Sequence, residues 1–323
     1  MKEIRIGENE SGQRLDKFLL KYMNRAPKSF LYKMMRKKNI TLNGKKAQGN
    51  EQLEKGDTVK LFLSDETIGK FTEQQDYAGN AGAELDILYE DKHTIFINKP
   101  AGMLSQKAEQ KDVSLVEHLI AYLLKTGQIT TDGLAAFRPS VCNRLDRNTS
   151  GIVAAGKTLA ALQELSGMFR ERTLRKYYLC LVKGTVTEKR RISGWLSKDE
   201  KTNKVTVRCA PDDGGVPIET EYRPVRSGDG VTLLEVHLIT GKTHQIRAHL
   251  ASEGHPIIGD YKYGSRAVND RFRKEYGLTS QLLHARRLCF PECEGTLSYL
   301  SGREIEAPVP ALFEKICRDR GVM

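Results

Sequence analysis

One short segment of this chain, NRLDRNTSG at residues 143–151, combines a carboxylate with two flanking guanidinium groups. Asp146 stands between Arg144 and Arg147, ahead of a small polar turn and the apolar run at 152–155. This order predicts a loop that leads into a buried strand. Because neighbouring cations favour the charged form of a carboxyl group, Asp146 is expected to be ionised and able to act as a nucleophile or a base. A surface salt bridge is the alternative for an isolated triplet of this kind.

The segment resembles HRLDxxTSG, the active-site motif of the RluA-type pseudouridine synthases. Further segments resemble other motifs of that family and occur in the family's order along the chain. They are NKPAGM at 98–103, KYYLCLVKG at 176–184, LITGKTHQIRAH at 238–249 and LHA at 283–285. Each string is weak alone, but together they are highly specific. The likeness extends from about residue 83 to the C-terminus.

The resemblance implies a catalytic set of Asp146, Arg247 and Tyr178. Asp146 would either attack the ribose C1′ or remove a sugar proton to form a glycal, and the sequence does not separate these routes. Arg247 would pair with Asp146, with a structural or phosphate-binding arginine as the alternative. Tyr178 would stack on the target uracil and accept or relay a proton, whereas the adjacent Tyr177 would face the other side of the strand.

The target base must leave its helix before an enzyme can reach C1′. The resemblance implies that Arg144 inserts where the base was, with a phosphate contact as the alternative. Ile246 and Leu283 would form apolar walls around the uracil, and Lys99 would lie near the RNA backbone. His244 and His284 are expected to be structural hydrogen-bonding residues.

Two positions depart from the family pattern. Asn143 replaces the usual His, so it can donate and accept hydrogen bonds but cannot titrate. A positioning role is therefore expected there instead of a proton-transfer role. Lys242 replaces the usual Arg and offers RNA a point charge in place of a bidentate fork.

The positive charge of the chain is concentrated at its N-terminus. The net charge is +11, and residues 1–63 carry 15 Lys and Arg against 7 Asp and Glu. A compact basic module suggests a polyanionic partner such as nucleic acid. The spacing of Leu15, Phe18, Leu19 and Tyr22 predicts one helix, and Pro27 with Ser29 predicts the start of another.

This region resembles the small S-four RNA-binding module. The likeness includes the Asn43-Gly44 turn and the Gly56-Asp57 turn before a strand. It implies that the second helix and the following loop contact RNA, although a share of their cations is expected only to solubilise the helix. The candidate RNA contacts are Lys33, Arg36, Lys37, Lys38, Lys45 and Lys46.

Three segments follow from these patterns: an S-four-like α/β domain at 1–63, an acidic flexible linker at 64–83, and a catalytic domain at 84–323. In the last, strands are expected around 87–89, 94–97, 151–155, 177–182, 205–207 and 233–238, and helices at 115–125, 159–169 and 244–252. Many strands with few helices predict a mixed, largely antiparallel α+β domain. The resemblance implies the pseudouridine synthase fold, with a bent sheet and a central cleft.

Several other classes of protein are disfavoured. The chain has no apolar run long enough to span a membrane and no secretory leader, and its six scattered Cys suggest reduced thiols in the cytoplasm. No metal-ligand spacing or phosphate-binding loop stands out, so neither a metal nor a cofactor is expected.

The expected function is isomerisation of uridine to pseudouridine in structured RNA by a monomeric enzyme. The substrate implied by the S-four-like module is large-subunit ribosomal RNA or a pre-ribosomal particle, with transfer RNA as the alternative. A non-catalytic ribosome-assembly factor is a second alternative. A retaining glycosidase ranks low, because such enzymes commonly use a pair of carboxylates and one well-placed carboxylate is evident here.

Overall fold

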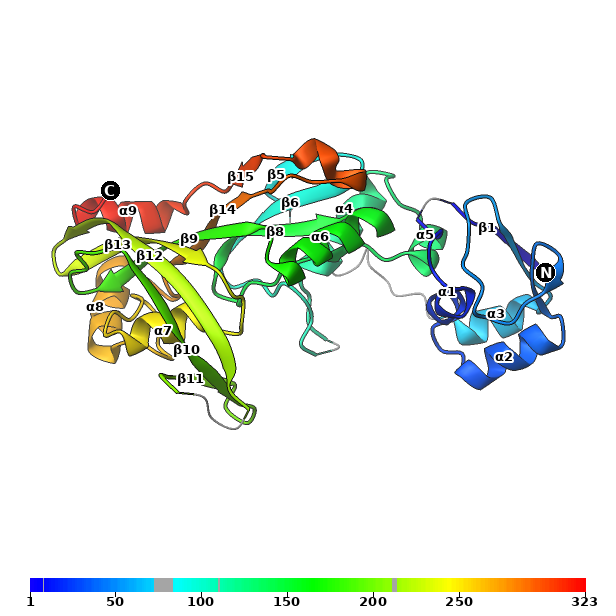
Figure 1. Cartoon of the computed structure of the whole chain (residues 1–323), viewed down its shortest axis with the longest axis horizontal. Coiled ribbons are helices and arrows are strands. Elements are labelled where there is room, and N and C mark those ends of the chain that lie inside the picture. Colours follow the sequence, from blue (N-terminus) through cyan, green and yellow to red (C-terminus); the bar gives the residue numbers. More distant parts are fainter. Residues whose placement is uncertain (8, 73–83, 110, 211–213) are drawn as a thin grey trace.

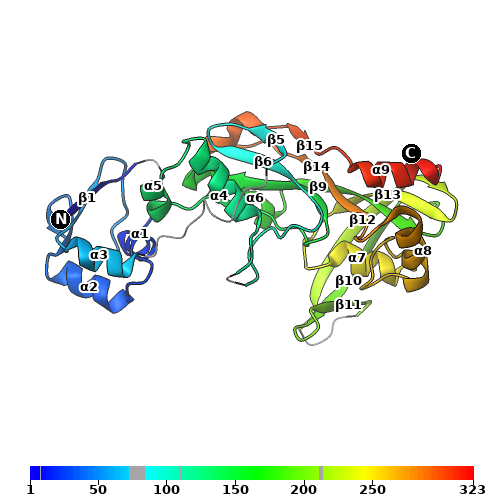
Figure 2. The same ribbon diagram turned by 180° about the vertical axis from the view of Figure 1, so that it is seen from behind.

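A computed structural model describes residues 1–7, 9–72, 84–109, 111–210 and 214–323. The described strands form a four-stranded sheet and an 11-stranded sheet. In both views of the molecule the small sheet and its helices form a separate group at one end (Figures 1 and 2). The large sheet extends from this group toward the C-terminus.

The N-terminal group has strand order β1-β4-β2-β3, and every pairing in it is antiparallel. Its strands are β1 (Lys2–Arg5), β2 (Ile40–Leu42), β3 (Lys45–Lys46) and β4 (Thr58–Leu61). Its helices are α1 (Leu15–Tyr22), α2 (Lys28–Arg36) and α3 (Asp65–Phe71).

The core of this group is built as the helical spacing predicts. The four predicted apolar residues of α1 are buried, together with Leu31 and Met35 of α2. Pro27 precedes α2 with φ −60°, which suits the first turn because proline offers no N–H that needs a partner. Both predicted helices are therefore confirmed.

The predicted linker at 64–83 is wrong in its first part. Ser64 accepts a hydrogen bond from the N–H of Thr67 and caps α3. Ile68 is buried in the N-terminal core, and the ring of Phe71 lies 4.6 Å from that of Phe30. Two apolar residues three apart, in a seven-residue helix, were too weak a pattern to detect. The remainder of the predicted linker, 73–83, lies outside the described residues.

The large sheet has strand order β11-β10-β12-β13-β9-β14-β8-β6-β5, with β15 on β14 and β7 on β8. Among the described pairs of named strands, β14 with β8 is the parallel one, so the sheet is mixed and largely antiparallel as predicted. The strands are β5 (Ile87–Glu90), β6 (Thr94–Lys99), β7 (Ser140–Val141), β8 (Ser150–Gly156), β9 (Arg175–Lys183), β10 (Arg190–Asp199), β11 (Lys204–Arg208), β12 (Val216–Gly228), β13 (Val231–Leu238), β14 (Leu283–Cys289) and β15 (Glu304–Glu306).

Helices cover both faces of this sheet. On one face, α4 (Leu115–Lys125) and α7 (Gln245–Ser252) pack into a core shared with Val153 of β8 and Tyr178 of β9. On the other, α6 (Leu159–Glu171) packs against Ile152 and its neighbours. The remaining helices are α5 (Thr131–Ala136), α8 (Arg266–Tyr276), the 3-10 helix η1 (Gly295–Leu300) and α9 (Ala311–Asp319). We call the face that carries Tyr178 the inner face.

Gly151 follows the loop that carries Asp146 and lies where β8 and β14 approach each other closely. It lies in β8, beside Ala285 of β14 in the parallel pairing, and has φ +111°. A Cβ atom at this position would lie 2.2 Å from the Ala285 carbonyl oxygen. Only glycine allows the two strands to come this close, because even a methyl group would overlap backbone atoms.

We therefore expect Gly151→Ala to lower the free energy of unfolding by about 3 kcal/mol or more, since backbone strain and overpacking add. The matched control is Gly127→Ala, because Gly127 also has positive φ (+69°) but has nothing within 4 Å of its Cβ position. That control should cost about 1 kcal/mol. Urea unfolding measures both, and equal losses would contradict the close-approach argument.

Candidate active site

The loop that carries Asp146 joins β7 to β8 and is held by hydrogen bonds on both sides. Asn143 donates to the carbonyl of Ile152 and accepts from the N–H of Ala154, at 3.1 and 2.8 Å. Ser105 Oγ bonds both the N–H and the carbonyl of Leu145, each at 3.0 Å. Asn143 therefore has the positioning role expected of it, and Asp146 projects from a fixed backbone.

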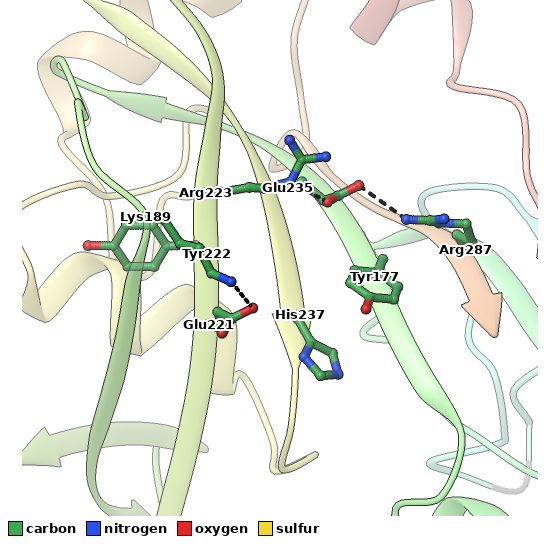
Figure 3. Close-up of a pocket in the computed structure, with 8 residues that line it drawn as sticks. All are labelled: Tyr177, Lys189, Glu221, Tyr222, Arg223, Glu235, His237 and Arg287. Atoms are coloured by element: carbon green, nitrogen blue, oxygen red, sulfur yellow. Dashed lines mark hydrogen bonds and ion pairs between the residues drawn. The ribbon is translucent and has the colours of Figure 1, made fainter. Parts of the chain in front are cut away.

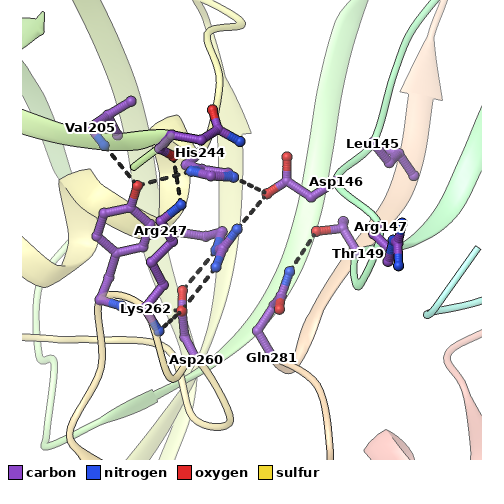
Figure 4. Close-up of polar contacts among 12 residues, drawn as sticks. Leu145, Asp146, Arg147, Thr149, Val205, His244, Arg247, Asp260, Lys262 and Gln281 are labelled. Carbon is purple, nitrogen blue, oxygen red and sulfur yellow. Dashed lines mark hydrogen bonds and ion pairs between the residues drawn. The ribbon is translucent and has the colours of Figure 1, made fainter. Parts of the chain in front are cut away.

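Asp146 forms an ion pair with Arg247 of α7, and the Nη1 to Oδ2 distance is 2.8 Å (Figure 4). The two residues are 101 positions apart in sequence. The Asp146 side chain is 26% exposed and that of Arg247 is 10% exposed, so one group reaches solvent while the other is held behind it. The structure thus contains the pairing that the sequence predicted.

A second carboxylate, Asp260, holds the other side of the same guanidinium. Arg247 Nε and Nη2 donate to its two oxygens at 2.8 and 3.0 Å. Burial opposes the charge of Arg247, but Asp260 and then Asp146 outweigh it and raise the pKa of Arg247 above its ordinary value. The arginine therefore stays charged and cannot rotate away from Asp146 without breaking its fork with Asp260.

Asp260 lies in the loop after Ile257, which forms an isolated bridge with Val182 of β9, and hydrogen bonds hold Asp260 in this loop. Its Oδ1 accepts the N–H groups of Lys262 and Tyr263 at 2.9 and 3.2 Å, and Asn269 donates to its carbonyl at 2.8 Å. Sequence reasoning missed Asp260. A single acid in the loop GDYKYG gives no sign that it is buried beside a cation, so the fold had to show it.

His244 and Tyr263 complete the surroundings of Arg247. His244 Nδ1 and Tyr263 Oη are 2.9 Å apart, and the guanidinium carbon of Arg247 lies 5.2 Å from the Tyr263 ring centroid. The other nitrogen of His244 lies 3.9 Å from Asp146 Oδ2, and burial lowers the pKa of this histidine. His244 thus has the expected structural hydrogen bond, and it also borders the carboxylate.

Tyr178 lies on the inner face, 8% exposed, in one apolar cluster with Leu145, Ile246 and Leu283. Burial and then the negative charge of Asp146 raise the pKa of the Tyr178 phenol. The phenol therefore keeps its proton at neutral pH. The structure brings together the predicted aromatic residue and both predicted apolar walls.

Tyr177 faces the opposite side of β9, as predicted. Its ring stacks on His237 with centroids 4.9 Å apart, and the guanidinium of Arg287 lies 4.7 Å from its centroid (Figure 3). These residues line a cavity of about 210 Å³ on the outer face. Of the two tyrosines, Tyr178 is therefore the one on the same face of the sheet as Asp146.

The prediction that Lys99 contacts the RNA backbone is wrong. Lys99 is 0% exposed, and its Nζ donates to the carbonyls of Pro100, Met103 and Arg147 at 2.9, 2.8 and 3.0 Å. Burial lowers its pKa to about 8, against an opposing effect of Asp146. Lys99 instead ties the turn at 100–103 to the loop that carries Asp146.

The other predicted RNA-binding cations reach solvent. Arg144 and Lys242 are exposed beside the site. The candidates of the N-terminal module are also exposed, on α2 and on the following turn and strand: Lys33, Arg36, Lys37, Lys38, Lys45 and Lys46.

The arrangement can supply a carboxylate at a fixed point beside an apolar and aromatic wall. Such a group can attack a carbon or remove a proton from a ligand that reaches it.

Among the described residues, no group of three or more His, Cys, Asp or Glu side chains is placed to hold a metal ion. No described helix is long and apolar enough to cross a membrane.

Comparisons with known proteins agree with this geometry. A family model described as RNA pseudouridylate synthase matches residues 93–252. Ribosomal large subunit pseudouridine synthase C of Vibrio parahaemolyticus is 33% identical over 97% of this chain and 94% of its own length. The same enzyme of Vibrio cholerae is 32% identical, with the same coverage.

A solved structure shows the likeness of the fold. Human RNA Pseudouridylate Synthase Domain Containing 4 matches with a TM-score of 0.56 and 22% identity. The match covers 72% of this chain and 91% of that protein. The predicted fold class is therefore confirmed.

The buried His284 makes the folding stability of the protein depend on pH. Its Nδ1 lies 2.9 Å from Ser150 Oγ, and burial lowers its pKa to about 4 from 6.5. Between pH 6.5 and about pH 4 the imidazole of His284 is protonated in the unfolded chain but neutral in the folded protein. Folding stability is therefore lost as the pH falls from about 6.5 toward 4. A shift of this size corresponds to roughly 3 kcal/mol.

We expect His284→Gln to remove this contribution, because Gln can bond Ser150 but does not titrate. The stability advantage of wild type over the variant should shrink by roughly 2–3 kcal/mol between pH 7 and pH 4. Urea unfolding at both pH values measures the difference. An advantage that stays constant would show that His284 is not buried in its neutral form.

Proposed function

Since this chain belongs to the RNA pseudouridylate synthase family, we propose that it isomerises specific uridines of large-subunit ribosomal RNA. The chain is an RNA pseudouridine synthase, which breaks the C1′–N1 bond, turns the uracil and joins C1′ to C5. The substrate proposal is supported by relatives named as large-subunit enzymes, aligned over nearly their full length. These names favour ribosomal RNA over transfer RNA and an enzyme over a non-catalytic assembly factor.

The observation that carries the catalytic assignment is the contact of Asp146 with the buried Arg247. Asp146 is the group that acts on the sugar, by attack on C1′ or by removal of a sugar proton to give a glycal. In either route its negative charge is lost at that step. Arg247 then still has Asp260 as a partner, so the buried guanidinium is never left without a counter-charge.

Tyr178 and its apolar neighbours receive the extruded uracil. The phenyl ring offers a stacking surface, and Ile246 with Leu283 excludes water from the base. Arg144 takes the place of the extruded base in the RNA helix, because a flat guanidinium can stack between bases. Lys242 contacts a phosphate as a point charge.

The N-terminal group binds RNA through an S-four-like surface. Its exposed cations follow one helix and the adjacent strand pair, which suits a polyanion. Such contacts are to phosphates and set affinity and register, whereas chemistry depends on Asp146.

We expect Asp146→Asn to abolish pseudouridine formation while RNA affinity stays within about twofold, because the amide keeps the shape of the side chain but is neither a base nor a nucleophile. Tritium release from RNA labelled at uracil C5 measures the reaction. Normal release by this variant would overturn the assignment of Asp146.

A companion variant tests the second carboxylate. Asp260→Asn keeps Asp146 but weakens the fork on Arg247, so turnover should fall roughly 10- to 100-fold, the size of a loss of about 1.5–3 kcal/mol. The control is Asp270→Asn on α8, whose side chain is 57% exposed. Equal rates for the two variants would deny Asp260 a positioning role.

A further prediction concerns α2. Lys33→Ala combined with Lys37→Ala should reduce the salt dependence of RNA binding by about one phosphate contact per lysine, with unchanged turnover at saturating RNA. Lys315→Ala, exposed on α9, is the control and should bind as wild type does. Filter binding at several salt concentrations measures the slope, and an unchanged slope would remove α2 from the interface.

Pseudouridine mapping in total RNA of a deletion strain tests the substrate. Loss of modification in large-subunit ribosomal RNA is expected. Loss confined to transfer RNA would refute the substrate proposal and leave the reaction itself intact.

A further inference from the structure

Lys176 lies on the inner face of β9, two residues before Tyr178, yet none of the steps above uses it. In the sheet register Lys176 pairs with Leu288 of β14. The next residue, Tyr177, pairs with His237 of β13. Because side chains two apart in a strand share a face, Lys176 and Tyr178 point to the same side. The lysine is 8% exposed.

The other buried lysines of this domain have partners. Lys99 donates to three carbonyls. Lys157 bonds Glu90 and the carbonyl of Asp91, both at 2.6 Å. Within the described part of the chain, no hydrogen bond or ion pair engages the ammonium group of Lys176. The Lys176 side chain is mostly buried, but its Nζ is not among the buried polar atoms that lack a partner, so the ammonium group reaches solvent and is open to a ligand of opposite charge.

The surroundings of Lys176 select an anion. Burial and then the positive charge of Arg172 lower its pKa to about 8, so no carboxylate balances it. Its Nζ lies 3.8 Å from the Cβ position of Gly241, in the turn that continues through Lys242 to His244. Gly241 lies four residues before Gln245, where α7 begins, and α7 carries Arg247.

We propose that Lys176 binds a backbone phosphate of the RNA substrate next to the uridine that is isomerised. A phosphodiester supplies the missing negative charge and is present beside every flipped nucleotide. Binding at this point holds the sugar-phosphate strand beside β9, which carries Tyr178. Lys176 is thus a phosphate-binding residue of the site, and this inference rests on the proposed function for its RNA ligand.

The test compares full-length Lys176→Met with Lys183→Met on unmodified large-subunit ribosomal RNA. Met has a similar length without charge, and Lys183 is exposed on the other face of the same strand. We expect Lys176→Met to weaken RNA binding about tenfold and to reduce the salt slope by about one phosphate contact. Lys183→Met should match wild type.

Phosphate ethylation interference identifies the contact directly. Ethylation of one phosphate near the modified uridine should weaken wild-type binding but have no further effect on Lys176→Met. The same pattern of interference in both proteins would overturn the proposal, as would an unchanged salt slope. Loss of turnover with normal binding and slope would also overturn it, because it would assign the amine to the chemistry.

Stability separates this proposal from a structural role. Because none of the residues that the structure describes pairs with the Lys176 ammonium and its side chain is mostly buried, Lys176→Met should leave the melting temperature unchanged or raise it. A large drop in melting temperature would indicate an internal partner and contradict the proposal. If wild type isomerises bulk transfer RNA but not ribosomal RNA, the substrate proposal fails, and the interference comparison is then made on transfer RNA.

Discussion

The clamping of Arg247 between two carboxylates is the interaction on which the site depends. One carboxylate, Asp260, is buried and fixed by backbone N–H groups, and the other, Asp146, reaches solvent. This asymmetry assigns different tasks to chemically equal groups. The buried partner keeps the guanidinium charged and in place, and the exposed partner is the group that reacts in the proposed mechanism. A single ion pair would leave the arginine uncompensated once Asp146 had formed a bond or gained a proton.

The backbone around Asp146 is as tightly constrained as the side chain. Lys99 gathers three carbonyls from two separate segments, Asn143 bonds β8, and Gly151 allows β14 to approach within a distance that excludes any side chain. These contacts come from the strands on either side of the loop. The position of Asp146 is therefore set by the sheet, because the strands around its loop hold the loop backbone in place.

The fold was predictable where local pattern is strong and poorly predictable where it is weak. The helix at 115–125 was found because its apolar residues recur at helical spacing, and the strands 94–97 and 151–155 were found because each is a short continuous apolar run, buried on both faces. The long strand β12 was missed, although Ile218, Thr220 and Tyr222 are buried and alternate with exposed or half-buried residues as in a strand with one buried face. Helix α3 was missed because two apolar residues make no period, although Ile68 is buried in the N-terminal core and Phe71 packs against it partly buried.

For the site, the sequence by itself determined the residue types and their order, namely an acid between cations, two adjacent tyrosines in a strand and an arginine after a TGK turn, and the family resemblance marked Asp146, Tyr178 and Arg247 among them as the proposed reactive groups. Their types and spacings are local properties, so they can be read from the chain. Tertiary structure alone decided that Asp260 holds Arg247, that Lys99 is buried under carbonyls instead of facing RNA, and that no described residue pairs with the ammonium group of Lys176. Burial and pairing depend on segments distant in sequence, and a local pattern cannot report what the fold brings against it.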